Sequence, residues 1–178
     1  RETKPELRAT LDVAAAIMSA ALAAGAILFI LSGIELALTP SLLGLAVAAA
    51  IANGLFDYHT ALIRARFLDG VYASLVIFKN ILAIILTVGG ALLTGSALIA
   101  LTGACLSMAG SLIFVRSAVS DREAHPKLAR FDLAMDAAKY SLPIITANIF
   151  YLAIVLGNRA LVTKHFGFAE TGQFSLAY

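Results

Sequence analysis

Charged and amide side chains interrupt two neighbouring apolar stretches of this sequence. Asp57 stands nine residues before Arg66, and Lys79 stands nine residues after Gly70. In an antiparallel helical hairpin both side chains would lie roughly 13 Å from the same end, at about 1.5 Å per residue. The spacing predicts an Asp57–Lys79 pair across the hairpin, with Asn53 one turn deeper on the face of Asp57.

Two roles fit this polar patch. A charge at the centre of a bilayer costs about 2.5–3.5 kcal/mol on insertion scales, so it usually faces a partner or water. Asn53, Asp57 and Lys79 could line a cavity open to the cytoplasm, with Asp57 as a candidate proton or cation site. They could equally form a buried structural pair, or reach out to the lipid headgroups.

A second set of polar residues lies in the last long apolar stretch. Asn148 and Arg159 share one stripe at the helical period, and Asn158 lies beside it. The guanidinium of Arg159 is always charged, and its planar fork suits phosphate oxygens. Arg159 could therefore bind phosphate in a cavity, or it could extend to the membrane interface beside Lys164 and His165.

The composition places these residues in a membrane. The chain is 61% hydrophobic and 13% charged, with a mean hydropathy of +0.92, which leaves too little polar surface for a soluble domain. A net charge of +2 gives no reason to expect nucleic acid as a partner. Neither a metal-ligand cluster nor a Gly-rich phosphate loop is present in the sequence. We therefore expect no metal, no cofactor and no enzymatic activity.

The pattern of apolar stretches predicts an all-α, polytopic transmembrane helical bundle. Each stretch has about the length needed to cross the hydrocarbon core. A polar segment at 1–10 precedes four spans, and an amphipathic cytoplasmic loop at 116–139 precedes residues 140–178, which hold a fifth span and the start of a sixth. The five spans are predicted at 11–34, 42–63, 71–93, 97–115 and 142–163.

Local signals define several boundaries. Ser141 and Pro143 predict the start of the fifth span, because a hydroxyl caps a first turn and proline is tolerated there. Gly167 and Gly172 are expected to break the helix within a turn at 164–173, and residues 94–96 (Thr-Gly-Ser) predict a tight turn. Small residues at four-residue spacing predict close helix approach; they are Ala15, Ser19 and Ala23, then Gly103, Ser107 and Ser111.

The positive residues predict the orientation. Ten of the 13 Lys and Arg residues fall in the N-terminal segment, the connection after the second span, and the 116–139 loop. These connections alternate along the chain, so all three should lie on the cytoplasmic side.

The last forty residues resemble a known family. They carry Tyr-Ser-Leu-Pro at 140–143, a span ending in Asn158–Arg159, Phe-Gly at 166–167, and Gly-x-Phe-Ser-x-Ala-Tyr at 172–178. This is similar to the seventh span of the O-antigen and exopolysaccharide flippases, a branch of the multidrug/oligosaccharidyl-lipid/polysaccharide exporter superfamily. Asn158 departs from the Asp common in that family. We expect the chain to be a fragment of a two-bundle transporter fold, covering about spans three to seven.

The resemblance implies a function without covalent chemistry. The cargo would be an undecaprenyl-diphosphate-linked oligosaccharide, moved from the inner to the outer leaflet of the bacterial plasma membrane for polysaccharide biosynthesis. Arg159 would contact its phosphates. Membrane lipids and other polysaccharide-assembly proteins are the expected partners. Two alternatives stay open, namely a multidrug exporter of the same superfamily and a membrane-embedded polysaccharide-assembly enzyme or subunit.

Overall fold

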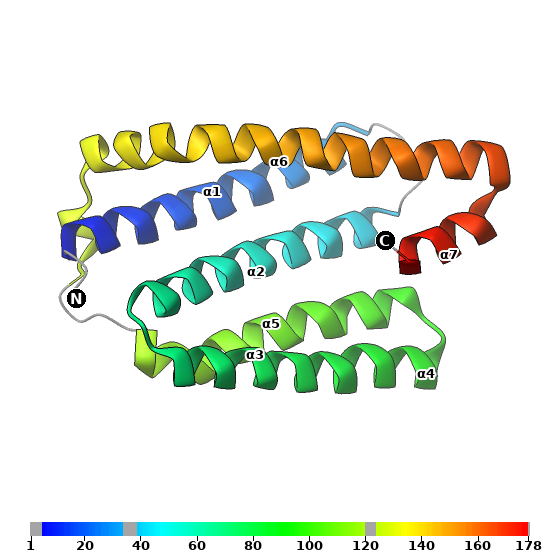
Figure 1. The fold of residues 1–178 in the computed structure, drawn as a ribbon, viewed down its shortest axis with the longest axis horizontal. Coiled ribbons are helices and arrows are strands. Elements are labelled where there is room, and N and C mark those ends of the chain that lie inside the picture. The colour runs from blue at the N-terminus through cyan, green and yellow to red at the C-terminus, as the bar shows by residue number, and fades with distance from the viewer. Residues whose placement is uncertain (1–4, 34–38, 120–123, 178) are drawn as a thin grey trace. The chain divides into compact units, whose positions relative to one another are not determined.

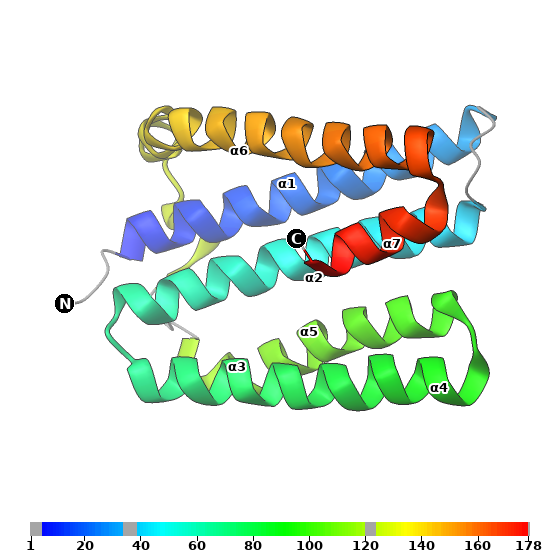
Figure 2. The same cartoon turned by 45° about the vertical axis from the view of Figure 1, so that its right-hand side comes forward.

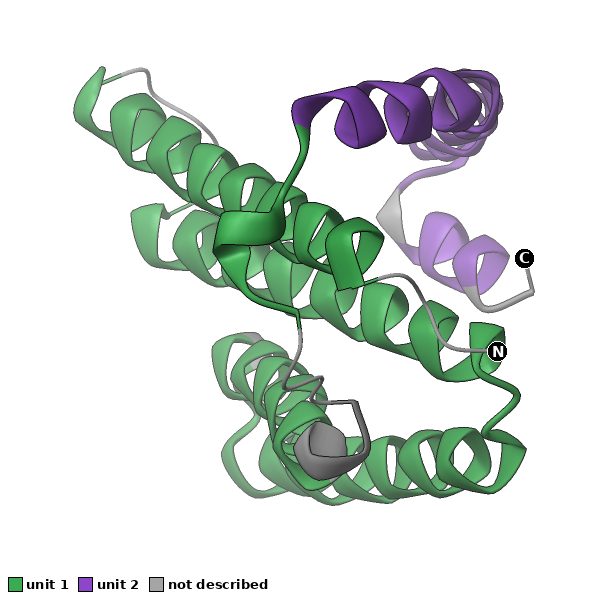
Figure 3. Cartoon of the chain, turned by 90° about the vertical axis from the view of Figure 1, so that its left-hand side faces the viewer, with its two compact units in different colours: residues 1–130 green, residues 131–178 purple. Residues whose placement is uncertain are grey.

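The described part of the chain folds into helices, as the apolar pattern predicts. A computed structural model describes residues 5–33, 39–119 and 124–177. The chain divides into two compact units, Arg1–Arg130 and Phe131–Tyr178, coloured green and purple in Figure 3. Parts of the predicted N-terminal segment and of the predicted 116–139 loop lie outside the described residues, which omit 1–4, 34–38 and 120–123. Tyr178 lies outside them too.

Unit 1 is built from helices that alternate in direction along the chain (Figures 1 and 2). The predicted spans beginning at 11, 42, 71 and 97 correspond to α1, α2, a continuous α3–η1–α4 rod and α5. Their bounds are α1 (Pro5–Leu31), α2 (Pro40–Ala65), α3 (Asp69–Ala83), the π-helical turn η1 (Ile84–Gly89), α4 (Gly90–Thr94) and α5 (Ala97–Val119).

The connection between α4 and α5 is the tight turn that the sequence predicts. Gly95 adopts the left-handed conformation with φ of 64°, which glycine reaches without steric cost. Its N–H donates to the carbonyl of Ala91 at 2.8 Å. The hydroxyl of Thr94 donates to the carbonyl of Gly90 at 2.7 Å and accepts from the N–H of Ser96 at 3.3 Å. These contacts satisfy backbone groups that the end of α4 leaves open.

Packing within unit 1 centres on α5, which contacts α2, α3 and η1. A small core of Phe56, Ile63 and Leu75 joins α2 to α3, and Val71, Tyr72 and Leu112 pack against it. The predicted ladder on α5 is confirmed, because Ser107 and Ser111 are only 1% and 0% exposed. Each hydroxyl donates to a carbonyl of its own helix at 2.7 Å, so neither polar group is left unpaired in this close contact.

The outer faces of the bundle are apolar. Met18, Leu92, Leu93 and Ile113 are each more than 70% exposed, a pattern that water does not tolerate but hydrocarbon does. Four of the described helices are long and apolar enough to cross a membrane; they are α1, α2, the Asp69–Thr94 rod and α6 (Phe131–Phe166). The apolar part of α5 is shorter, Leu98–Phe114.

Unit 2 contradicts the helix start that Ser141 and Pro143 predict. One 36-residue helix, α6, begins at Phe131 and passes through Pro143 without ending. Residues 131–139 of the predicted amphipathic loop are therefore the first turns of α6. Proline lacks the N–H that would bond to the carbonyl of Lys139, but a long apolar helix tolerates one such gap. Ser141 lies inside the helix and caps nothing.

The C-terminal boundary is only partly as predicted. Gly167 does end α6, with φ of 93°. The expected break at Gly172 is wrong, because α7 (Phe168–Ala177) contains this residue. The hydroxyls of Thr163 and Thr171 lie 2.9 Å apart and join α6 to α7. That contact stabilises the connection between α6 and α7, which is shorter than the turn predicted at 164–173.

Candidate functional site

The predicted ion pair between Asp57 and Lys79 does not form between these described side chains. Asp57 instead accepts a hydrogen bond from Nδ2 of Asn53 at 3.1 Å, as their four-residue spacing allows. The ammonium of Lys79 lies 5.2 Å from the centre of the Phe56 ring, a distance at which cations are attracted to the ring face.

Helical geometry explains this exchange of partners. Lys79 follows the core residue Leu75 by four positions, so its side chain lies on the face that meets Phe56. Asp57 is the next residue after Phe56, and neighbouring helical residues point about 100° apart. Asp57 is consequently exposed, while Phe56 is buried. Counting residues along a hairpin gives the depth of each side chain, but not the direction in which it points.

The other three candidates lie on α6 in unit 2. Asn148 and Arg159 are exposed and Asn158 is half-buried. Asn148 and Arg159 differ by only about 20° around the helix axis, so the predicted stripe exists on α6. Asn53, Asp57 and Lys79 belong to unit 1. A cavity shared by the two sets stays a prediction.

A polar cluster that the sequence reasoning missed joins α1 to α2. The Nε of Arg8 donates to both carboxylate oxygens of Asp12, at 3.1 and 2.9 Å. The hydroxyl of Tyr58 donates to Oδ1 of Asp12 at 2.5 Å, and the Arg8 guanidinium lies 5.9 Å from the Tyr58 ring centre. We call these three residues the Asp12 cluster.

Burial makes the Asp12 cluster unusual. The side chain of Arg8 is 5% exposed, whereas that of Asp12 is 41% exposed. Nη1 of Arg8 is buried and has no hydrogen-bond partner among the described residues. Buried guanidinium groups normally have their donors satisfied, so the cluster holds a cationic donor that its own carboxylate does not use.

Two signals in the sequence point to this cluster. Arg8 and Asp12 have the i,i+4 spacing of a helical ion pair, and Asp12 falls just inside the predicted span 11–34. Tyr58 gives no such signal, because its contact with Asp12 joins residues that are 46 positions apart. The partnership of the two helices appears only in the folded chain.

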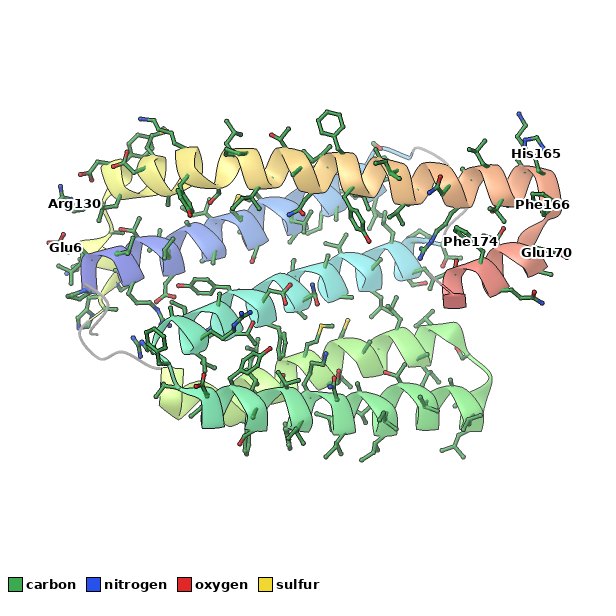
Figure 4. All side chains as sticks on the ribbon, in the orientation of Figure 1. Glu6, Arg130, His165, Phe166, Glu170 and Phe174 are labelled. Carbon is green, nitrogen blue, oxygen red and sulfur yellow. The ribbon has the colours of Figure 1, made fainter. Side chains whose placement is uncertain are left out.

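The segment that precedes α6 is held against the first turns of α1. The short 3-10 helix η2 (Pro126–Leu128) packs on α1. The backbone N–H of Arg130 donates to the Thr10 hydroxyl at 3.0 Å, and its guanidinium pairs with Glu6 at 3.3 Å. Figure 4 shows Glu6 and Arg130 together at this end of the bundle. We call these contacts the Arg130 clamp.

The clamp should depend on the Thr10 hydroxyl. Thr10→Val keeps the shape of the side chain but removes the acceptor for the Arg130 N–H. One hydrogen bond contributes about 1 kcal/mol, so the Arg130 amide should exchange with solvent roughly fivefold faster. Hydrogen-exchange mass spectrometry measures this rate. Thr10→Ser is the matched control, since it keeps the acceptor and should exchange like the parent; equal rates in both variants would refute the contact.

The described residues contain no group of three or more His, Cys, Asp or Glu side chains close enough to hold a metal ion. Nδ1 of His59, a histidine within α2, lies 2.7 Å from the carbonyl oxygen of Leu55. That local hydrogen bond gives Nδ1 of the His59 ring a partner within its own helix.

Several described basic side chains of unit 1 lie at one end of the bundle, where α1 begins and α2 ends (Figure 1). Arg8 reaches Tyr58, Arg64 lies 5.7 Å from the ring centre of Tyr72, and Arg130 pairs with Glu6. Lys79, by contrast, follows Tyr72 by seven residues, which is about two turns further along the Asp69–Thr94 rod. The orientation of this end in the membrane stays a prediction from the positive residues.

Long helices with apolar outer faces define a multi-pass, all-α membrane protein. In comparisons with known proteins, the chain matches no family model, no curated protein and no solved structure.

Proposed function

We propose that this chain is part of a transporter that moves a lipid-linked oligosaccharide, carried on undecaprenyl diphosphate, from the inner to the outer leaflet of a bacterial plasma membrane. Arg159 carries the proposal. It is exposed on α6, a helix apolar enough to cross the membrane. A cation in such a helix requires an anionic or aqueous partner.

The chemistry of Arg159 selects a phosphate. Its guanidinium has a planar set of donors that matches phosphate oxygens and cannot lose its charge. Within α6, Asn148 lies on the same stripe about 16 Å away, so the amide could bind sugar hydroxyls while Arg159 binds the diphosphate. The resemblance of residues 140–178 to polysaccharide flippases supports the same assignment.

The proposal is tested in the bacterium that makes the protein. Arg159→Lys and Arg159→Ala should both abolish surface polysaccharide while the amount of protein in the membrane stays unchanged. Lysine keeps the charge but loses the two-pronged geometry. Lys164→Ala is the matched control, because it removes an exposed positive charge from the same helix and should leave polymer within about twofold of the parent. Normal polymer in both Arg159 variants, or loss of drug resistance instead of polymer, would overturn the proposal.

A further inference from the structure

An apolar groove runs between α1 and α2. It encloses about 320 Å³, near the lower end of the volumes of about 300–1,000 Å³ typical of small-molecule sites. Its walls are Ala15, Met18, Ser19 and Leu22 on α1, and Ala50, Ile51, Gly54 and Leu55 on α2. At Gly54 the space is open, since an added Cβ would meet no atom within 4 Å.

The groove leads to the Asp12 cluster. On α1, Ala15 and Ser19 follow Asp12 by three and seven residues, so they share its face. On α2, Leu55 and Gly54 precede Tyr58 by three and four residues and share the face of that ring. The two walls of the groove therefore continue into the two helices that Asp12 and Tyr58 join.

At this end of the groove, one donor nitrogen of Arg8 is left for a further hydrogen-bond acceptor. Asp12 engages Arg8 through Nε, while Nη1 is buried and has no partner in the part of the chain that the structure describes. A buried cationic donor of this kind is costly unless an acceptor reaches it. Arg8 precedes Thr10, which the Arg130 clamp holds, by two residues, so we expect an incoming anion to reach Arg8 when the clamp opens.

We propose that the groove binds one anionic phospholipid of the bilayer, with an acyl chain between α1 and α2 and its phosphate at Arg8. Phospholipids join an apolar chain to a phosphate, which matches apolar walls that end at a guanidinium group with one nitrogen still open to an acceptor. The site does not depend on the transport proposal, because the same contacts would hold this lipid whatever the protein carries.

The test compares two leucine substitutions on one helix. Gly54→Leu fills the groove, whereas Gly44→Leu adds the same side chain to α2 where, again, no atom lies within 4 Å of the new Cβ. The intact protein is taken from nanodiscs of equal phosphatidylglycerol and phosphatidylcholine, and native mass spectrometry counts the retained lipid. The parent and Gly44→Leu should retain one phosphatidylglycerol; Gly54→Leu should retain at least tenfold less.

Two further variants keep the outcome decisive. If Gly54→Leu fails to fold by circular dichroism, Ser19→Leu fills the groove from the opposite wall and should give the same loss. The double variant Arg8→Met/Asp12→Leu should still retain a lipid but lose the preference for phosphatidylglycerol. Equal retention by the two glycine variants would overturn the site, and so would a parent that retains no lipid. A parent without preference for the anionic lipid would overturn the role of Arg8.

Discussion

Gly103→Ala should be among the most destabilising single substitutions in unit 1. A Cβ added at Gly103 would lie 2.5 Å from the carbonyl oxygen of Leu86 and 2.9 Å from the backbone nitrogen of Thr87. Both atoms belong to the π-helical turn η1, where backbone rather than a flexible side chain must move. Overpacking of this kind costs about 1–3 kcal/mol, and we expect the upper part of that range. Thermal unfolding of the purified protein in detergent measures the loss.

Gly110→Ala provides the control for this substitution on the same helix. Its added Cβ would lie 2.9 Å from Cδ2 of Leu82, which is the far end of a side chain that can change rotamer. The cost should stay below about 1 kcal/mol, because a rotamer adjustment is smaller than a backbone shift. Similar losses in the two variants would show that the contact with η1 is not the cause.

Asp12→Ala should destabilise the protein by about 3 kcal/mol. The substitution leaves the guanidinium of Arg8, 5% exposed, without its counter-ion, and removes the acceptor of the Tyr58 hydroxyl. Breaking a buried pair from one side typically costs about 3–5 kcal/mol, and the partial exposure of Asp12 favours the lower end. Denaturant unfolding in mixed micelles gives the free energy.

The double variant Arg8→Met/Asp12→Leu distinguishes a lost pair from lost packing. Replacing both charges with apolar side chains of similar size is often neutral or stabilising, so the double variant should recover most of the stability that Asp12→Ala loses. A double variant as unstable as Asp12→Ala would mean that the pair is not the source of the effect. The Tyr58 hydroxyl loses its acceptor in both, which keeps the comparison matched.

Local signals predict much of this fold correctly. The apolar lengths locate every rod of unit 1, and the glycine at 95 ends α4 as expected. The small residues on α5 mark the face that approaches η1, because close backbone approach is possible only where side chains are small. Pro143 misleads for the same local reason. A helix start is the commonest place for proline in water, whereas a long apolar helix can include it.

The candidate site is less predictable, because it depends on contacts between distant residues. Lys79 contacts Phe56 rather than Asp57, since the rotation of each helix about its axis decides which neighbours meet. Tyr58 and Asp12 meet only after α1 and α2 pair, and Arg130 reaches Thr10 from 120 positions away. The depth of a residue in a membrane can be counted along the sequence. The direction in which its side chain points around the helix axis depends on how the helices pack.

The helix α6 is longer than the hydrocarbon core of a bilayer. Its 36 residues extend for about 54 Å at 1.5 Å per residue, against a hydrocarbon thickness of about 30 Å. The missing hydrogen bond at Pro143 makes that turn the easiest place to flex, and Phe131 lies about 18 Å further along the axis. A bend of about 10° at Pro143 would displace Phe131 by about 3 Å. A small change in the angle of α6 at the proline would therefore move its N-terminal end by about the length of a hydrogen bond.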